Sequence, residues 1–464
     1  MRTRTNTTMM SLERRKLFGT DGIRGRANDF PMTPEVALQL GRAIAHVFRR
    51  AQSHSRPRIV IGKDTRLSNY MFETALQAGI CSMGVDAVQL GVLPTPGIAF
   101  LTAGMRADAG VVISASHNPY DDNGIKFFAA DGYKLPDEVE RQIEDLLELG
   151  NVADFRAHGR DIGRAYRIQD AVGRYAVFLK SSFPRHLALD GMRVVVDCAN
   201  GAAYKVAPEV LYELGAEVVP LGTTPDGTNI NEGVGALHPE LMAKKVREVR
   251  ADLGIALDGD ADRVIMCDAE GNILDGDQLL LVLARRMKAQ GRLAKDTVVA
   301  TVMSNLGLER ALRGLGIAME RVQVGDRYVV ERMREGRFVL GGEQSGHIVM
   351  TDFASTGDGL MAALQVLAEV VETGKPIGAL AAGFEPVPQV LEGVKVALKP
   401  PIESLESVVA AIDEAKKAIG DGRVLVRYSG TEKKCRVMLE GDDAEVLRAH
   451  ADAIVAALRR EIGA

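Results

Sequence analysis

The chain has 464 residues, of which 46% are hydrophobic and 26% charged, with a formal net charge of -5 at pH 7. At about one domain per 150 residues, this length predicts about three domains and leaves room for a small fourth. The charge balance gives no basic excess for nucleic acid, so we expect small-molecule partners and no nucleic-acid partner. No segment approaches the ~18 continuous apolar residues of a membrane-spanning helix, so we expect no membrane partner.

The first residues and the cysteines indicate a cellular compartment. Residues 1–16 carry five Arg or Lys and no apolar signal-peptide core, and they predict a disordered tail or an extension ahead of a start at Met9 or Met10. The four cysteines lie far apart and form no C-x-x-C pair, at Cys81, Cys198, Cys267 and Cys435. Together these features predict a protein of the reducing cytoplasm.

One pattern of strand, helix, second strand and third strand occurs three times along the chain. First strands are expected within 57–66, 192–201 and 296–305. Second strands are expected to begin at a glycine, within 84–91, 215–222 and 316–325. Third strands are expected within 107–119, 251–263 and 336–347. Strands that alternate with helical stretches of about 10 to 15 residues indicate βαβ units, so the repeat predicts three related α/β domains with mixed sheets.

After about Phe384 the composition changes to a proline-spaced strand region. A helix over 402–418, a strand-turn-strand over 423–441 and a last helix to Arg460 follow, which predict a smaller α+β domain. The expected divisions are a tail at 1–16, α/β domains at 17–168, 169–272 and 273–384, and the α+β domain at 385–464.

The most polar and glycine-rich loops follow the three third strands. They span 114–119, 258–262 and 342–347. In open α/β sheets, ligands bind beyond the carboxyl ends of strands. We therefore expect these loops to form three walls of one central cleft.

Three carboxylates alternate in the sequence LDGDADRV, namely Asp258, Asp260 and Asp262. On an extended loop they would point to one side, where they would need a cation. An EF-hand requires Gly at position 6 and Glu at position 12, where this chain has Arg263 and Ala269. An acidic surface loop is the alternative, but the preceding LGIAL is typical of a buried strand. The pattern favours Mg²⁺, which takes a few carboxylates together with waters and phosphate oxygens.

The loop SASHNP places Ser116 beside His117. Adjacent side chains on extended backbone point apart and no G-x-S-x-G elbow exists, so a hydrolase triad is not expected. A serine that carries a phosphate fits better, although an ordinary loop hydroxyl would be the choice for this loop alone. Lys126 is a candidate general acid or base, because an ammonium among other cations can be pushed toward neutral pH; a solvated lysine is the alternative. Arg24 lies in FGTDGIRG, whose glycines predict either close backbone approach to an anion or a simple turn.

Two further motifs predict binding of a sugar and of a phosphate. GGEQSGH offers donors and acceptors suited to sugar hydroxyls or an amine, at Glu343, Ser345 and His347, with a tight turn as the alternative. RYSGTEKKCR predicts a phosphate cradle at Arg427, Ser429, Gly430, Thr431 and Arg436. The chain contains neither a Walker A motif nor G-x-G-x-x-G, so a nucleotide is not the expected phosphate carrier.

Five motifs stand in the order typical of one family: GTDGIRG, SASHNP, DGDADR, GEQSGH and RYSGTE. From Leu17 onward the chain resembles the α-D-phosphohexomutase superfamily. The resemblance implies four domains around a central cleft and an isomerase that acts on a small sugar phosphate. KLFGTDGIRG, TVMSNLGLE and VGDRYV most resemble the members that interconvert glucosamine 6-phosphate and glucosamine 1-phosphate, which feeds amino-sugar and cell-wall precursor synthesis. Members that act on mannose or glucose phosphates are the alternative, and a non-catalytic sugar-phosphate sensor is a more distant one.

The resemblance also implies roles for residues. Ser116 would carry a phosphate and, with Asp258, Asp260 and Asp262, hold one Mg²⁺. Arg263 would contact the serine phosphate, and His117, Lys126 and Arg24 would serve the catalytic centre. Glu343, Ser345 and His347 would hold the sugar, and Arg427, Ser429, Gly430, Thr431 and Arg436 its phosphate. A sugar bisphosphate is the implied intermediate and activator, and a homodimer is left open. One departure is Lys433 and Lys434, which follow SGTE where the family usually has proline.

Overall fold

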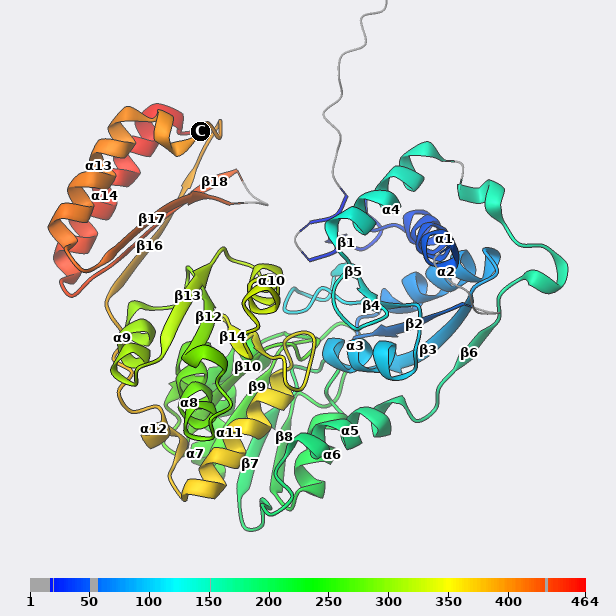
Figure 1. Cartoon of the computed structure of the whole chain (residues 1–464), viewed down its shortest axis with the longest axis horizontal. Coiled ribbons are helices and arrows are strands. Elements are labelled where there is room, and N and C mark those ends of the chain that lie inside the picture. The colour runs from blue at the N-terminus through cyan, green and yellow to red at the C-terminus, as the bar shows by residue number, and fades with distance from the viewer. Residues whose placement is uncertain (1–16, 20, 51–56, 151, 430–432) are drawn as a thin grey trace, which may run out of the picture.

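The computed structural model describes residues 17–19, 21–50, 57–150, 152–429 and 433–464 (Figure 1). The predicted tail at 1–16 and two predicted cradle residues, Gly430 and Thr431, lie outside the described residues. Within the described ranges, no helix combines the length and apolar composition that crossing a bilayer requires. Four sheets, each with its own helices, make up the fold.

The first sheet has six strands in the order β1-β5-β4-β2-β3-β6. They are β1 (Ile23–Arg26), β2 (Arg58–Lys63), β3 (Asp86–Val92), β4 (Ala109–Ile113), β5 (Asp122–Ala129) and β6 (Ala165–Arg167). Its helices are α1 (Pro34–Arg50), α2 (Asn69–Ser82), α3 (Thr95–Gly104) and α4 (Asp137–Leu149). Leu17 and Phe18 precede β1, and their N–H groups both donate to Glu144 Oε1 of α4.

The second and third sheets are formed by strands within residues 193–350. The second has the order β11-β10-β9-β7-β8 and consists of β7 (Arg193–Asp197), β8 (Glu217–Leu221), β9 (Leu253–Leu257), β10 (Val264–Asp268) and β11 (Ile273–Leu274). The third has the order β13-β12-β14-β15 and consists of β12 (Thr297–Thr301), β13 (Ala318–Val322), β14 (Leu340–Gly342) and β15 (Ile348–Met350). The helices are α5 (Ala171–Ser182), α6 (Val206–Glu213), α7 (Pro239–Val249), α8 (Gly276–Ala289), α9 (Leu306–Gly314), α10 (Asp326–Gly336), α11 (Gly359–Thr373) and α12 (Ile377–Leu380).

The threefold repeat predicted from the sequence is confirmed by the strand order. The runs β3-β2-β4-β5, β8-β7-β9-β10 and β13-β12-β14-β15 are equivalent. In each run the first strand in sequence pairs in parallel with the second and third, and the third pairs antiparallel with the fourth. The third strands are buried along their length, as expected for strands covered on both faces.

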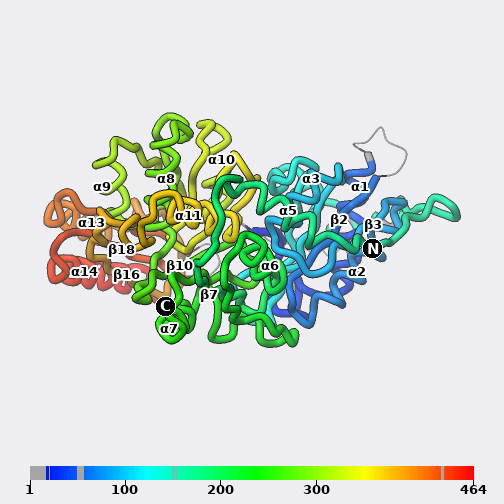
Figure 2. The backbone as a smooth tube through the Cα atoms, turned by 90° about the horizontal axis from the view of Figure 1, so that it is seen from below, coloured from blue at the N-terminus to red at the C-terminus, as the bar shows by residue number. Residues whose placement is uncertain are grey.

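The fourth sheet is antiparallel and small, with the order β16-β18-β17. It consists of β16 (Gln389–Lys395), β17 (Arg423–Tyr428) and β18 (Lys434–Glu440), with α13 (Glu406–Ile419) and α14 (Ala444–Ile462). The helix expected from Ile402 begins at Glu406 instead, because Ser404 N donates to Pro401 O and the chain first makes a short 3-10 turn. Figure 2 shows this part at one end of an elongated molecule and the first sheet at the other.

The hydrophobic clusters show which sheets share one core. One hydrophobic cluster runs through the first three sheets and includes Val60, Val196 and Leu364. The fourth sheet has a separate core, which includes Val437 and Leu458. The loops carried by the first three sheets are therefore fixed relative to one another by continuous packing.

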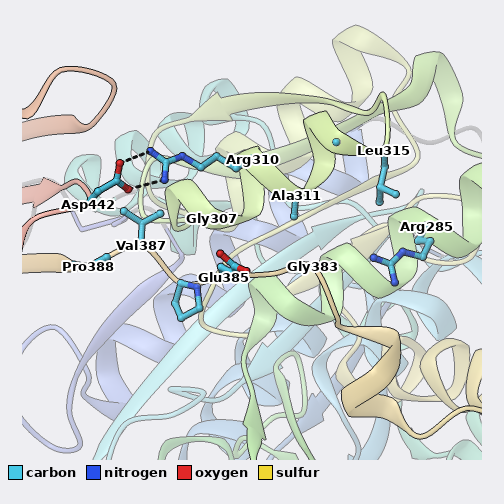
Figure 3. Close-up of a pocket in the computed structure, with 12 residues that line it drawn as sticks. Arg285, Gly307, Arg310, Ala311, Leu315, Gly383, Glu385, Val387, Pro388 and Asp442 are labelled. Carbon is cyan, nitrogen blue, oxygen red and sulfur yellow. Dashed lines mark hydrogen bonds and ion pairs between the residues drawn. The ribbon is translucent and has the colours of Figure 1, made fainter.

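Polar contacts and a pocket mark the junction between the third and fourth sheets. Arg310 on α9 forms an ion pair with Asp442 at 2.7 Å, beside a pocket of about 560 Å³ that Glu385 and Pro388 help to line (Figure 3). Arg423 of β17 donates to the carbonyl oxygen of Ser304, at 3.0 Å. None of the predicted site residues lines this pocket.

Candidate active site

The three polar loops occupy equivalent places, each between the third and fourth strand of its unit, and the structure brings them together. Ser116 Oγ of the first loop donates to Asp258 Oδ2 of the second at 2.5 Å. Arg263, which follows the second loop, forms a β-bridge with His347 of the third. The shared strand order thus brings three loops that are at least 80 residues apart in sequence into one site.

The Ser116 loop departs from the extended backbone that the sequence predicts. Ser116 has a φ of 51°, in the left-handed region, and is buried. Its Oγ lies 3.4 Å from His117 Nδ1, so the prediction that the two side chains point apart is wrong. Burial, Arg263 and Arg24 lower the pKa of His117 to about 4. The imidazole beside Ser116 is therefore neutral at pH 7.

The three aspartates converge, but through a turn and not through strand alternation. Ala261 N donates to Asp258 O at 3.0 Å, and Ala261 has a φ of 58°. Oxygen atoms of Asp258, Asp260 and Asp262 lie within 4.8 Å of one another, and all three side chains are buried. Burial, together with the neighbouring Asp262 and Asp260, raises the pKa of Asp258 well above its usual range.

This carboxylate group fits a divalent cation. Asp260 Oδ1 and Asp262 Oδ1 are buried and have no hydrogen-bond partner among the residues that the structure describes. Buried carboxylate oxygens without partners are costly, and a hard cation such as Mg²⁺ or Ca²⁺ would satisfy them. The group can therefore hold a metal ion.

The closest charged neighbours of Lys126 on β5 are carboxylates. Its Nζ is 3.1 Å from Asp21 Oδ2, 3.2 Å from Asp260 Oδ2 and 4.0 Å from Asp262 Oδ2. Burial alone would lower its pKa, but Asp21 and Asp260 outweigh burial and raise the pKa above its usual range. The prediction of a lysine pushed toward neutral pH is therefore wrong, since the sequence could not show which charges surround it.

Asp21 is a site residue that sequence reasoning missed. It contacts three cations: Lys126 at 3.1 Å, Lys134 at 2.5 Å and Arg24 in a short ion pair. Lys134 also reaches Asp326 at the start of α10, at 2.5 Å. The only sequence signal for Asp21 was its position inside the GTDGIRG motif.

The two predicted catalytic arginines come from different sheets, Arg24 from the first and Arg263 from the second. Arg24 is on β1, and Gly22, just before this strand, has a φ of 75°, where a Cβ would come within 2.4 Å of Ile125 O. That glycine thus permits packing of the chain on β5, which is the role that the structure gives it. The backbone N–H of Arg263 donates to Asp258 Oδ1 at 3.1 Å, and Arg263 Nε lies 3.9 Å from Asp262 Oδ1.

The third loop is held against the other two. Glu343 Oε1 accepts a hydrogen bond from Gly325 N at 3.1 Å, and Ser345 is exposed. His347 is buried, with Nδ1 3.6 Å from Asp262 and Nε2 3.7 Å from Asp326. Burial opposes protonation of His347, but Asp262 and Asp326 raise its pKa to about 9. His347 therefore contacts the carboxylate loop, whereas Ser345 faces solvent.

The predicted phosphate cradle lies on the fourth sheet. Arg427 of β17 is the direct cross-strand partner of Arg436 of β18. Burial and Arg436 lower the pKa of Arg427. Ser429 is buried, and Lys399 Nζ donates to its carbonyl oxygen at 2.6 Å. Lys399 is a cation at this place that no sequence motif indicated.

The chain matches known proteins over nearly its whole length. Family models of phosphoglucomutase/phosphomannomutase match in chain order: α/β/α domain I at residues 15–151, domain II at 174–271, domain III at 275–387 and the C-terminal domain at 393–457. A phosphoglucosamine mutase of Anaeromyxobacter dehalogenans is 60% identical over 458 residues, covering 97% of this chain and 100% of the relative. One of Syntrophotalea carbinolica is 56% identical, covering 97% and 98%.

The fold recurs in solved structures. A phosphoglucomutase/phosphomannomutase family protein of Burkholderia thailandensis superposes with a TM-score of 0.78 at 24% identity, covering 96% of this chain and 97% of the other. The resemblance seen in the five sequence motifs is confirmed by these matches. The chain belongs to the phosphoglucomutase/phosphomannomutase family, on the branch of its relatives named phosphoglucosamine mutase, and is an isomerase that transfers a phosphoryl group within its substrate.

Proposed function

We propose that the chain interconverts glucosamine 6-phosphate and glucosamine 1-phosphate through a phosphoserine at Ser116 and a sugar bisphosphate. The observation that carries the proposal is the 2.5 Å contact between Ser116 Oγ and Asp258 Oδ2, inside a buried group of three carboxylates. The amino sugar as substrate is supported by relatives named phosphoglucosamine mutase at 60% and 56% identity.

The proposed reaction balances as two phosphoryl transfers. First the bond between phosphorus and Ser116 Oγ breaks, a bond to a free hydroxyl of the sugar phosphate forms, and the proton of that hydroxyl replaces phosphorus on the serine oxygen. The resulting bisphosphate turns around. Its other phosphoryl group then returns to Ser116 Oγ, and the sugar oxygen that it leaves takes the serine proton.

The metal would be Mg²⁺, held by Asp258, Asp260 and Asp262 together with the serine phosphate. When bound, it would neutralise charge on the transferred phosphoryl group. Arg263 adds a cation on the same side, since its backbone N–H already donates to Asp258.

Two side chains support the proton transfers in this proposal. His117 is neutral at pH 7, with a pKa of about 4, and lies 3.4 Å from Ser116 Oγ, so it can carry the exchanged proton through Nδ1. Lys126 keeps its charge because its pKa is raised, and with Arg24 it supplies positive charge and a proton donor beside Asp260.

Each proposed domain contributes one part of the site. Residues 17–168 carry the serine, 169–272 the metal loop, 273–384 the sugar loop and 385–464 the phosphate cradle. Arg427 and Arg436 stand directly opposite each other, so they place two positive charges side by side, where they would attract a phosphate. A cradle that grips whichever phosphate is not reacting lets one serine serve both ends of the sugar. With Ser429, Gly430 and Thr431, these arginines would bind that phosphate.

Amino-sugar phosphates should be preferred over glucose and mannose phosphates, with Glu343 as the partner of the substrate amine. A buried carboxylate rejects a substrate that leaves it unpaired, so we expect a preference of more than about a hundredfold in kcat/KM. Glu343→Gln keeps an acceptor for Gly325 N–H but loses the charge. It should reduce turnover of glucosamine 1-phosphate much more than turnover of glucose 1-phosphate.

The measurement is kcat/KM of the unmodified chain and of Glu343→Gln on a panel of hexose and hexosamine phosphates. Equal or faster turnover of glucose 1-phosphate or mannose 1-phosphate by the unmodified chain would favour the alternative, a phosphoglucomutase or phosphomannomutase. No turnover of any of these sugars would contradict both.

Arg427→Ala should weaken binding of the non-reacting phosphate. Losing one or two charge-assisted hydrogen bonds of about 1.5 to 3 kcal/mol each predicts a loss in kcat/KM of about ten- to several-hundredfold. The phosphate on Ser116 and the metal requirement should be unchanged, because Ser116 and the three aspartates lie on other sheets. The measurement is steady-state kinetics at low and high salt.

The matched comparison is a Lys433→Ala, Lys434→Ala double variant. Lys433 is exposed, and Lys434 opens β18 opposite Lys395. We expect a smaller loss that fades as salt screens long-range attraction. A loss equal to that of Arg427→Ala, without salt dependence, would show that the lysines contact substrate directly.

A further inference from the structure

Two side chains from different domains donate to the same two carbonyl oxygens of the Ser116 loop. Arg66 Nη2 donates to Ser116 O at 2.9 Å and to Asn118 O at 2.8 Å. Asn231 Nδ2 donates to the same atoms, at 2.9 Å and 3.1 Å. We call these four hydrogen bonds the carbonyl clamp.

Arg66 lies in the connection between β2 and α2 and is fully buried. Three further hydrogen bonds hold its guanidinium group in place. Its Nε donates to Asp64 Oδ2 at 2.9 Å, and its Nη1 donates to the carbonyl oxygens of Pro119 and Asp122. A buried arginine whose donors nearly all go to one loop holds that loop as a unit. Taken alone, the hydrogen bonds of Arg66 would be explained by stabilisation of the fold.

Asn231 adds a contact that local folding of the Ser116 loop does not require. It lies more than 100 residues away, in the connection between β8 and α7, with a φ of 60°. The Ser116 carbonyl oxygen has two lone pairs and accepts from two donors, so the two hydrogen bonds restrain the peptide plane that follows the left-handed Ser116. That plane sets the direction of the serine Cβ and hence the position of Oγ.

The carboxylate loop packs directly on the clamp. A Cβ on Gly259, between Asp258 and Asp260, would come within 2.6 Å of Ser116 O and 2.8 Å of Asn231 Nδ2. Side chains do not tolerate such distances to a backbone oxygen, so only glycine fits. The clamp therefore lies between the serine and the carboxylates and sets their spacing.

We propose that Arg66 and Asn231 are positioning residues that hold Ser116 Oγ at one place relative to the three aspartates. This inference rests on the proposed phosphoserine function. A serine that gives up and regains its phosphate in each turnover must return to the same geometry twice, and its strained backbone would otherwise relax. The clamp acts through the loop backbone, so neither side chain needs to touch the substrate.

The decisive variant is Asn231→Gly. Glycine adopts a φ of 60° without strain, so the change removes the two donors while the backbone conformation stays accessible. We expect kcat to fall by between about tenfold and a hundredfold, the scale of a small misplacement of a reacting group, with KM little changed. Asn231→Asp keeps the shape but sets a carboxylate against two carbonyl oxygens, and it should be at least as slow.

The matched control is Thr228→Ala in the same connection. Thr228 is exposed, and its Oγ1 donates to Asp226 at 2.9 Å without reaching the Ser116 loop. It should keep the kinetics of the unmodified chain. Arg66→Lys tests the other half of the clamp, and because both residues serve the same carbonyls, its effect should combine non-additively with Asn231→Gly.

Intact-mass analysis of the same samples separates the two hypotheses. An unmodified chain that never carries phosphate on Ser116 would contradict the proposed function. A phosphorylated chain whose Asn231→Gly variant has an unchanged kcat per phosphorylated serine would overturn the positioning role, even if the variant melts at a lower temperature. A reduced kcat per phosphorylated serine at unchanged KM supports it.

Discussion

Ser116→Ala should abolish phosphoryl transfer and should remove phosphate from the purified protein. The substitution deletes the one atom that would form the bond to phosphorus, so turnover should fall by more than about 10³-fold, the scale of losing a covalent nucleophile. The fold should change little, because the Ser116 hydroxyl contacts only Asp258 and, at a longer distance, His117 among the described residues. Turnover assays, intact mass and peptide mapping make the measurement.

Ser181→Ala is the matched control for this variant. Ser181 is exposed on α5, where its hydroxyl donates to Phe178 O within the same helix. It should retain both activity and the phosphate-dependent mass shift. A fully active Ser116→Ala variant, or phosphate mapped only to other residues, would refute the phosphoserine hypothesis.

The strand order and the meeting of the three polar loops could be predicted from the sequence because both follow from a repeat. Each unit shows the same succession of apolar strands, and ligand-binding loops follow the carboxyl ends of such strands. Ser116, Asp258 and His347 accordingly lie in equivalent loops. The convergence of the aspartates was also predictable, although a turn at Ala261, with a φ of 58°, produces it.

What the sequence could not provide was the set of neighbours around each charge. Lys126 was expected to have a lowered pKa, but Asp21 and Asp260 lie beside it and raise the pKa. Asn231 belongs to no catalytic motif, and only the tertiary fold places it on the Ser116 carbonyl. Such long-range pairs depend on how two sheets pack, which no local pattern encodes.

Asp260→Asn should weaken Mg²⁺ binding and remove most activity. Asp260 Oδ2 already accepts from Thr95 Oγ1 at 2.7 Å and faces Lys126 at 3.2 Å, while Oδ1 is buried and has no hydrogen-bond partner in the described part of the chain. Oδ1 is therefore the oxygen left for a cation. Because outer-shell partners of metal ligands are worth about 10- to 100-fold in affinity, losing a direct ligand should weaken Mg²⁺ binding by at least that factor.

Mg²⁺ titration of activity, paired with calorimetry of Mg²⁺ binding to the unmodified chain and the variant, measures this effect without relying on turnover alone. Asp268→Asn is the matched control, since Asp268 is a buried carboxylate on β10 that accepts from Asn272 N at 2.8 Å and lies outside the group of three aspartates. It should bind Mg²⁺ as the unmodified chain does. Two outcomes would contradict the metal site: undiminished turnover after exhaustive chelation, or equal Mg²⁺ affinity of Asp260→Asn and the control. Either would mean that Asp260 Oδ1 does not bind a metal ion that the reaction needs.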